Sequence, residues 1–558
     1  MRQDRKLSSK LTWHYGCKVC KVATDRVKGE KLSIEMTIDC LNEMGKTHQF
    51  TRKSIETIAK SSSIAGLVSV GLGICESILI VPLFLQVWGS EKYGLWGSLL
   101  AMVALLHSIT IGFQTYAGNE FGKYYHSDMS RAGQVLGSAI RMILLLGVLE
   151  LVVFAALVGS GGAARMLGLD LGDPRLAGLY GGVFCYGLSW LLIQGFGGLF
   201  IRVIMPIGEF SRSVILGILL QAMQICVLIV AAFNGWSIFA TCLTMSIVLT
   251  VFSTSVILDV KRRLPHVFSW WKLGSLSEGV NLAIRSVTIS AATVMEQFSL
   301  NGVSLLVTAL LSPQLLPIWL TSRTVVNLGF QVSNQLLNPL CPEMVRFHAT
   351  RDGEKLAQVI KASWIFVTVV VIIPMTIASP LLTTAYSIWT AGELTLDRGV
   401  FVLLTAGLCL NLTARPYFFY LYGLNAEVAQ IVMSMTRTVL LLIVSITLAP
   451  ALGLTAFAMG VFMAELGGGL LCRYYARKKL SDFGGNPPMR DECLVGGIAL
   501  SATVAMALYL FLPEYKWFGA AIAVSMTVLL TILQWQNLSP SVRQRIKNSI
   551  LPLKLRMT

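Results

Sequence analysis

A row of polar side chains lies along one face of the helix that the sequence predicts near residues 316–340. Its members recur at steps of three or four residues, the spacing that keeps side chains on one helix face: Arg323, Asn327, Gln331, Asn334 and Asn338. Carboxamides donate and accept hydrogen bonds, and the planar guanidinium fork fits the oxygens of a phosphate. The chemistry that this row favours is the non-covalent binding of a polar, anionic ligand.

A second row of the same spacing lies in the apolar segment 279–310, and it carries Arg285 and Glu296. A charge in the membrane hydrocarbon costs about 2.5–3.5 kcal/mol on insertion scales, so such side chains face a cavity or a partner. Arginines outnumber acids within the apolar segments, where we count Arg141, Arg285, Arg323, Arg415 and Arg437 against Glu76, Glu150, Glu296 and Glu465. This balance favours an anionic substrate over a cationic one.

We therefore predict a central cavity whose substrate-binding side chains are three arginines and three carboxamides: Arg285, Arg323, Arg437, Asn327, Gln331 and Asn334. Arg285 and Arg323 would bind a diphosphate, with Arg437 as a further candidate. Glu76 and Glu296 would either pair with these arginines or couple transport to a proton or sodium gradient.

Structural roles are the alternative for these side chains. Amides can hydrogen-bond between helices, and Arg141 and Arg415, near helix ends, can reach the headgroups. Glu76 paired with an arginine can serve only to hold the bundle together, and His107 fits a core histidine better than a proton relay.

Catalytic and cofactor motifs do not accompany these rows. The sequence contains no phosphate-binding glycine loop with its lysine, and the close pair Cys17 and Cys20 lacks the second ligand pair of a metal site. We expect a protein that is not an enzyme and that has no metal or cofactor, with an ion gradient as the alternative energy source.

The composition identifies the elements that must position these residues. Of 558 residues, 54% are hydrophobic and 13% are charged, against a charged share of about 25% in soluble domains. Fourteen apolar segments are long enough to cross a membrane: 63–88, 94–117, 134–158, 177–201, 213–233, 236–258, 279–310, 316–340, 361–388, 399–422, 427–449, 453–472, 493–512 and 516–535. We predict an all-α polytopic membrane protein.

The basic residues are distributed unevenly between the loops. With the N-terminus in the cytoplasm, 35 of the 45 Lys and Arg residues fall on the cytoplasmic side and five on the opposite side. Membrane proteins concentrate Lys and Arg in cytoplasmic loops, so both termini are expected in the cytoplasm. The same bias explains the net charge of +16 without a nucleic-acid partner.

Two short matches suggest an internal repeat. Trp96 and Trp319 are 223 residues apart, as are Glu120 and Glu343, and each pair spans one crossing and the charged loop after it. An offset of six crossings preserves orientation, as in the parallel repeats of transporters.

The repeat implies two six-helix bundles around a central cavity, with a C-terminal helix pair in addition. The predicted parts are a basic cytoplasmic tail, two bundles with a linker, the helix pair and a second basic tail: 1–60, 61–260, 261–278, 279–480, 493–535 and 536–558. For the first tail, an over-long gene start is the alternative, because Met36 and Met44 precede the first crossing closely.

Residues 81–106 resemble a known family. The turn Gly89-Ser-Glu-Lys-Tyr-Gly-Leu-Trp96 is similar to the Gly-x-Glu-x-Tyr-Gly turn of polysaccharide and O-antigen flippases, and the loop 342–356 resembles their charged loop after the eighth crossing. These flippases belong to the multidrug/oligosaccharidyl-lipid/polysaccharide (MOP) exporter superfamily. The resemblance covers about residues 61–480. Fourteen crossings depart from the twelve of many sugar flippases and match the peptidoglycan-precursor flippases.

The resemblance implies a flippase that moves undecaprenyl-diphosphate-linked oligosaccharide across the bacterial cytoplasmic membrane by alternating access. Its place would be surface polysaccharide, lipopolysaccharide O-antigen or exopolysaccharide synthesis. Its partners would be the lipid-linked oligosaccharide, membrane lipids, and a polysaccharide polymerase with other assembly proteins. Two transporters remain as alternatives, a multidrug or metabolite exporter of the same superfamily and a peptidoglycan-precursor flippase. A membrane-embedded glycosyltransferase would be expected to carry a large extramembrane loop, and the longest loop here has only about twenty residues.

Overall fold

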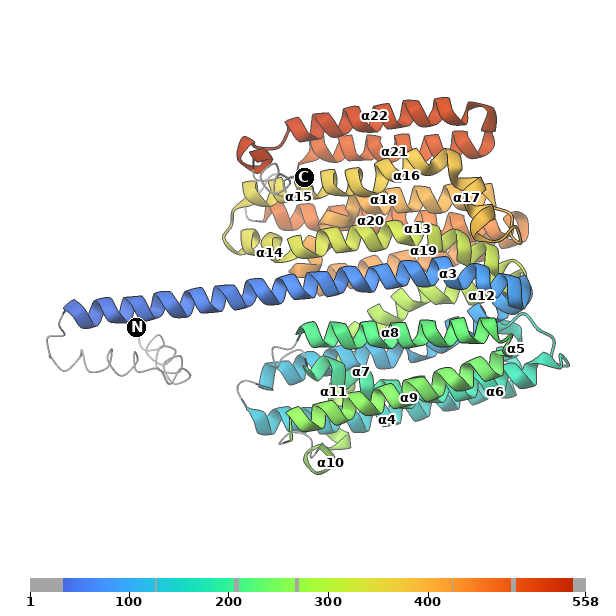
Figure 1. The fold of residues 1–558 in the computed structure, drawn as a ribbon, viewed down its shortest axis with the longest axis horizontal. Coiled ribbons are helices and arrows are strands. Elements are labelled where there is room, and N and C mark those ends of the chain that lie inside the picture. The colour runs from blue at the N-terminus through green and yellow to red at the C-terminus, as the bar shows by residue number, and fades with distance from the viewer. Residues whose placement is uncertain are drawn as a thin grey trace. The chain divides into compact units, whose positions relative to one another are not determined.

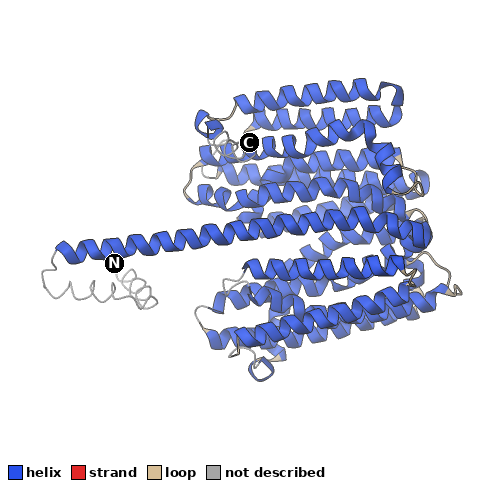
Figure 2. Cartoon of the chain, viewed as in Figure 1, coloured by secondary structure: helices blue, strands red, loops and turns tan. Residues whose placement is uncertain are grey.

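A computed structural model describes residues 34–125, 128–204, 210–265, 270–424, 426–482 and 488–544, with the backbone alone for 34–67. The chain forms two compact units, Met1–Ala65 and Gly66–Thr558, and only the second is discussed below. Most of both predicted tails, 1–60 and 536–558, lies outside the described residues. The described part of the chain contains helices and loops and no strand (Figure 2), so the all-α prediction is confirmed.

The helices up to residue 263 form what we call the N-terminal half. They are α3 (Ile34–Tyr125), α4 (Met129–Gly159), α5 (Gly162–Met166), α6 (Arg175–Leu188), the π-helical turn η2 (Ser189–Gln194), α7 (Gly195–Ile204), α8 (Phe210–Phe233) and α9 (Ile238–Arg263). Figure 1 shows α4, α6, α8 and α9 gathered as one group. Their buried side chains form two apolar cores, one around Phe84 and Trp96 and one around Phe113 and Phe200.

The helices from residue 276 to residue 481 form the C-terminal half, and a short helix, α10 (Trp270–Leu273), precedes it. They are α11 (Leu276–Gln297), η4 (Phe298–Gly302), α12 (Val303–Leu310), α13 (Leu316–Leu337), η5 (Asn338–Leu340), α14 (Cys341–Ala349), α15 (Gly353–Val367), η6 (Thr368–Ile372), α16 (Ile373–Ala378), η7 (Ser379–Leu381), α17 (Leu382–Trp389), α18 (Arg398–Gly423), α19 (Glu427–Leu452) and α20 (Leu454–Ser481).

Two further helices follow, α21 (Met489–Phe511) and α22 (Lys516–Gln536). They pack side by side against this half (Figure 1). The turn η8 (Pro513–Tyr515) joins them. Two carboxylates at the start of α21 attach the pair, because Asp491 lies 3.0 Å from Lys361 of α15 and Glu492 lies 2.8 Å from Arg473 of α20. The predicted C-terminal helix pair is therefore fixed to the C-terminal half by ion pairs.

The number of crossings follows from helix length and hydropathy. Within the described residues, 11 helices are long and apolar enough to span a membrane. One of them, Gly71–Tyr125, contains two crossings, and the more polar α11–α12 and α13 are not among the 11. With these the count would reach the fourteen crossings that the sequence predicts, and the apolar helices make the chain a multi-pass membrane protein.

The first two crossings are the two arms of α3. Gly89 adopts φ 73° and ψ 170°, which is outside the helical region and in the left-handed half of φ that glycine tolerates. In a continuous helix, Phe84 and Trp96 would be about 18 Å apart along the axis. Their ring centroids lie 6.4 Å apart, so the chain reverses at Gly89. We call this end of the molecule the Gly89 end.

A broken helix connects the two halves. Helix α11 packs against α4 of the N-terminal half and also against α19, whereas α12 contacts α5, α13 and α20. The π-helical turn η4 separates α11 from α12. Such turns are frequent at functional sites because they leave backbone groups without their usual helical partners.

Contacts between equivalent positions support the predicted repeat. Three pairs of residues that are 223 positions apart lie against one another: Glu91 with Gln314, Gly94 with Pro317, and Gly97 with Leu320. Around a two-fold axis, a position next to the axis meets its own counterpart. A pseudo-two-fold axis therefore passes between the second arm of α3 and α13.

Candidate functional site

Arg323 of α13 bonds to the broken helix. Its two terminal nitrogens donate to the carbonyl oxygens of Leu300 and Ser299, each at 2.8 Å, and its guanidinium lies 5.7 Å from the ring of Trp319. These carbonyls belong to η4, so Arg323 replaces hydrogen bonds that the π-helical turn lacks. Among the described residues, no carboxylate forms an ion pair with Arg323.

Arg415 of α18 lies against the same row of side chains. Its Nε donates to Oδ1 of Asn334 on α13 at 2.9 Å, and its guanidinium lies 4.8 Å from the ring of Phe418. Arg415 also lies within electrostatic range of Arg437, Glu465 and Glu296. The sequence left open whether Arg415 reaches the lipid headgroups or points into the bundle. The structure shows it pointing into the bundle, toward α13.

Arg437 of α19 forms an ion pair with a carboxylate of the neighbouring helix α20. Its terminal nitrogen lies 3.2 Å from Oε2 of Glu465 on α20, and the side chains are 21% and 16% exposed. The same carboxylate oxygen accepts a 2.6 Å hydrogen bond from Asn411 of α18. Arg437 lies directly against Gly468, where a Cβ would overlap its guanidinium. A glycine at this position therefore makes room for the arginine.

Together these side chains form a cationic group that we call the arginine cluster: Arg323, Arg415, Arg437, Asn334, Asn411 and Glu465. Four helices supply it, α13, α18, α19 and α20. Glu465 acts electrostatically on both Arg323 and Arg415. Of the three guanidinium groups, that of Arg437 forms an ion pair with this carboxylate, and Glu296 of α11 adds a second negative charge nearby. The cluster therefore keeps a net positive charge.

A second polar group lies where α3, α8 and α13 approach. Glu76 of α3 accepts a 3.1 Å hydrogen bond from Nε2 of Gln221 on α8. A Cβ on Gly73 would lie 3.5 Å from Gln221 and 3.7 Å from Gln331 of α13. The predicted site residues Glu76 and Gln331 thus lie in the same region, on opposite halves. The partner that the structure gives Glu76 is an amide and not an arginine.

Helix α11 presents its polar row to the surface of the protein. At about 100° per residue, Arg285 and Glu296 fall on one arc, and Ile284 and Val287 fall on another about 140° away. All four side chains are exposed. An exposed polar arc beside a separate exposed apolar arc is the pattern of a helix that borders both water and lipid. Arg285 lies on this exposed face of α11, and among the described residues no hydrogen bond or ion pair joins it to the arginine cluster.

The two halves differ in polarity at equivalent positions. The α13 positions Arg323, Asn327, Gln331 and Asn334 correspond, 223 residues earlier in α3, to Leu100, Ala104, Ser108 and Ile111. Only the C-terminal copy carries the polar row. Asn327 and Gln331 are half-buried, as Arg323 is, so the row lies on a face that packing only partly covers.

The N-terminal half instead contains a buried pair of titratable groups. Nδ1 of His107 on α3 lies 3.6 Å from Oε2 of Glu150 on α4, with side chains 1% and 6% exposed. Thr110 donates a 2.8 Å hydrogen bond to the other oxygen of Glu150. The ring of Trp190, in η2, meets the His107 ring edge-on at 5.4 Å. The structure thus gives His107 a carboxylate neighbour, which the sequence reading did not foresee.

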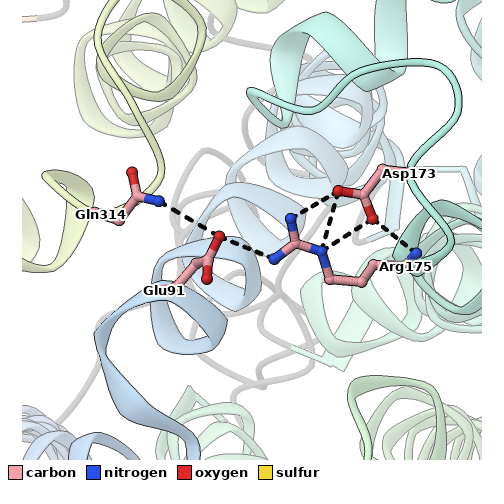
Figure 3. Close-up of polar contacts among 4 residues, drawn as sticks. All are labelled: Glu91, Asp173, Arg175 and Gln314. Atoms are coloured by element: carbon pink, nitrogen blue, oxygen red, sulfur yellow. Dashed lines mark hydrogen bonds and ion pairs between the residues drawn. The ribbon is translucent and has the colours of Figure 1, made fainter.

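The Gly89 end holds the halves together. Arg175 at the start of α6 lies between Asp173 and Glu91, and Gln314, before α13, donates to Glu91 from the other half (Figure 3). The Arg175 guanidinium holds the pKa of the Asp173 carboxyl below its usual range. Deeper in the protein, the hydroxyls of Ser98 on α3 and Thr308 on α12 lie 2.8 Å apart and are fully buried.

Apolar contacts reinforce this closure. Val81 and Leu85 of α3 pack with Tyr386 and Leu394 of the C-terminal half. The indole of Trp389 donates a 3.1 Å hydrogen bond to a backbone carbonyl of α3. The two halves are therefore in tight contact at the Gly89 end, which the charge distribution predicts to face outward.

Comparison with known proteins gives the fold a context. No protein-family model and no curated protein sequence matches the chain. Among solved structures, an inward-facing MATE-family multidrug resistance transporter of the MOP superfamily matches with a TM-score of 0.59 and 12% identity, over 76% of this chain and 99% of that one. The lipid II flippase MurJ, in an inward closed conformation, matches with a TM-score of 0.60 and 13% identity, over 85% and 97%.

A MATE transporter of Vibrio cholerae matches with a TM-score of 0.51 and 12% identity, over 77% of this chain and 97% of that one. At such identities the likeness concerns the fold. The chain therefore has the helical architecture of MOP-superfamily transporters. Within the described residues, no group of three His, Cys, Asp or Glu side chains lies close enough to hold a metal ion.

Proposed function

We propose that the protein is a flippase that moves undecaprenyl-diphosphate-linked oligosaccharide across the bacterial cytoplasmic membrane for surface polysaccharide assembly. The observation that carries this proposal is the arginine cluster, in which three arginines stand against one carboxylate, that of Glu465, and only Arg437 is ion-paired with it. A diphosphate needs several donors and compensating positive charge, and guanidinium groups supply both. The flippase and exporter folds to which the chain is similar agree with such a role.

The proposed mechanism is alternating access about the pseudo-two-fold axis. The halves are in contact at the Gly89 end, and the proposal has the substrate enter from the opposite, cytoplasmic end. The diphosphate binds Arg437 and Arg415 of the cluster, with Arg323 and the amides of α13 beside them. Rocking of the halves then separates the contacts of Ser98 and Thr308 and releases the substrate outward.

Arg285 takes a different place in this proposal from the one that its spacing suggested. It lies on the exposed arc of α11. We propose that Arg285 and Glu296 border the entry from the cytoplasm, where a first contact with the diphosphate does not require its full desolvation. Glu76, bonded to Gln221, remains the candidate for coupling to a proton or sodium gradient.

A multidrug or metabolite exporter is the second candidate. Its supporting observation is Glu465, a half-buried carboxylate in the middle of the cluster, because carboxylates are what a cationic drug would bind. A peptidoglycan-precursor flippase is a variant of the first proposal, since both lipid substrates carry a diphosphate. A polysaccharide polymerase is proposed as a partner on the same basis as the substrate.

The test is transport by the purified full chain in liposomes. Fluorescent undecaprenyl-diphosphate trisaccharide, lipid II and the cationic dye ethidium serve as separate probes. We expect flipping of the first above protein-free liposomes, and its loss in Arg437→Gln. The matched control is Arg398→Gln, an exposed arginine outside the cluster. Ethidium transport without diphosphate flipping would overturn the proposal, and flipping of lipid II alone would reassign its substrate.

A further inference from the structure

A basic groove of about 490 Å³ runs along the last turns of α20, and one face of that helix lines it: Leu470, Arg473, Tyr474, Arg477, Lys478 and Ser481. These positions lie between about 80° and 220° from Glu465 around the helix axis, at about 100° per residue. The groove therefore faces away from the arginine cluster. It needs a ligand other than the transported substrate.

The length of α20 sets the depth of the groove in the membrane. The helix has 28 residues and is about 42 Å long, whereas the hydrocarbon core is about 30 Å thick, or about 20 residues. Counted from Leu454, the core ends near Arg473. Leu470 and Tyr474 are 56% and 59% exposed and lie at this boundary. The cationic groups that follow lie at the depth of lipid phosphates.

The groove carries a surplus of positive charge. Arg473 and Arg477 share the carboxylate of Glu492 on α21, each at 2.8 Å. Lys478 is exposed, and no carboxylate among the described residues pairs with it. Three cations and one anion leave a net charge of about two, in a recess with an aromatic ring and an apolar side chain at its hydrocarbon edge.

We propose that this groove binds the phosphate headgroup of an anionic membrane phospholipid. Lys478 and the exposed edge of the Arg477 guanidinium contact the phosphate, and Leu470 and Tyr474 contact the start of an acyl chain. Basic recesses beside transmembrane helices on the cytoplasmic side suit such headgroups.

The chain provides a matched control for the test. Lys479 is the next residue, carries the same charge and is exposed, but it does not line the groove. The purified full chain in phosphatidylcholine nanodiscs is titrated with phosphatidylglycerol, and the thermal unfolding midpoint and lipid retention by native mass spectrometry are measured. We expect a rise in midpoint for the natural protein, for Lys479→Gln and for Lys478→Arg. Lys478→Gln should bind about fivefold more weakly, the effect of about one basic residue near an anionic surface.

Two results would overturn the proposal. Equal losses in Lys478→Gln and Lys479→Gln would show a diffuse attraction to charge rather than a site. A rise of the unfolding midpoint by the same amount when inorganic phosphate replaces phosphatidylglycerol would show that the acyl edge of the groove plays no part. Lys478→Arg separates loss of charge from a folding defect, because it keeps the charge on an exposed position.

Discussion

The sign of the charge that the arginine cluster binds is testable with two reciprocal variants. Glu465→Gln removes the carboxylate that Arg437 and Asn411 share, and so raises the positive charge of the cluster by one. Arg415→Gln lowers it by one. Glutamine keeps hydrogen-bonding capacity at both positions, so the main change is electrostatic. A diphosphate ligand should bind more tightly to the first variant and more weakly to the second.

The geometry of the cluster sets the expected magnitude. A phosphate oxygen in contact with the Arg437 guanidinium would lie about 6 Å from Glu465, because the ion pair itself measures 3.2 Å. At that distance two unit charges interact by roughly 3 kcal/mol at an effective dielectric constant of 20 and by about 0.7 kcal/mol in water. A half-buried site lies between these limits. We expect a change of about 1–2 kcal/mol, or roughly fivefold to thirtyfold in Kd.

The assay is equilibrium binding to the purified chain in detergent. Geranylgeranyl diphosphate is the anionic probe and ethidium the cationic one, each titrated at two salt concentrations. Opposite shifts of the two probes in each variant are the expected result. Tighter ethidium binding in Arg415→Gln, with diphosphate binding unchanged in both variants, would refute the anionic site and favour the exporter. Intact unfolding profiles are required of each variant before its Kd is compared.

The remaining predictions concern the Gly89 end. Gly94→Ala should favour the outward-open state, because the added Cβ would overlap a backbone carbonyl of the other half at a cost of about 1–3 kcal/mol. Spin-label distances across the Gly89 end would measure the opening. The control Gly71→Ala, where the added Cβ meets open space, should leave these distances unchanged. A disulfide between cysteines replacing Ser98 and Thr308 should stop transport until reduced, and transport that continues in the oxidised protein would contradict the rocking mechanism. The pKa of Asp173 is lower in the folded protein than in the unfolded chain, where it is about 4. The ion pair of Asp173 with Arg175 therefore stabilises the Gly89 end fully above about pH 4 and is lost only at lower pH. Spin-label distances at this end should not change between pH 5 and 8.

The fold was predictable from the sequence because each crossing is a local property of about twenty residues. The reversal at Gly89 follows from a glycine in a polar turn, and the offset of Trp96 and Trp319 predicted the repeat whose counterparts meet at the axis. The row on α13 was visible because its period is that of a helix. None of these required knowledge of which helices lie side by side.

The partners of the polar side chains were not predictable in the same way. Asn334 and Arg415 bond across two helices, and sequence spacing within one helix carries no information about the other. Asn411 and Arg415 share a face of α18 at a step of four, which was the available signal for the missed part of the cluster. Gln221, the partner of Glu76, shares a face of α8 with Gln224 at a step of three, but this spacing did not indicate which helix would supply its partner.

The π-helical turn between α11 and α12 couples the binding of an anion by Arg323 to the rotation of α12. Arg323 donates to two carbonyls of that turn, and an anion that attracted the guanidinium would compete for the same donors. A turn that lost them would regain its hydrogen bonds by relaxing to α-helical pitch, which rotates the following segment by about 100° for each residue of shift. Thr308 lies on that segment and bonds to Ser98, so the rotation would break this contact between the two halves. Binding of the substrate and opening of the Ser98–Thr308 contact would then be one movement.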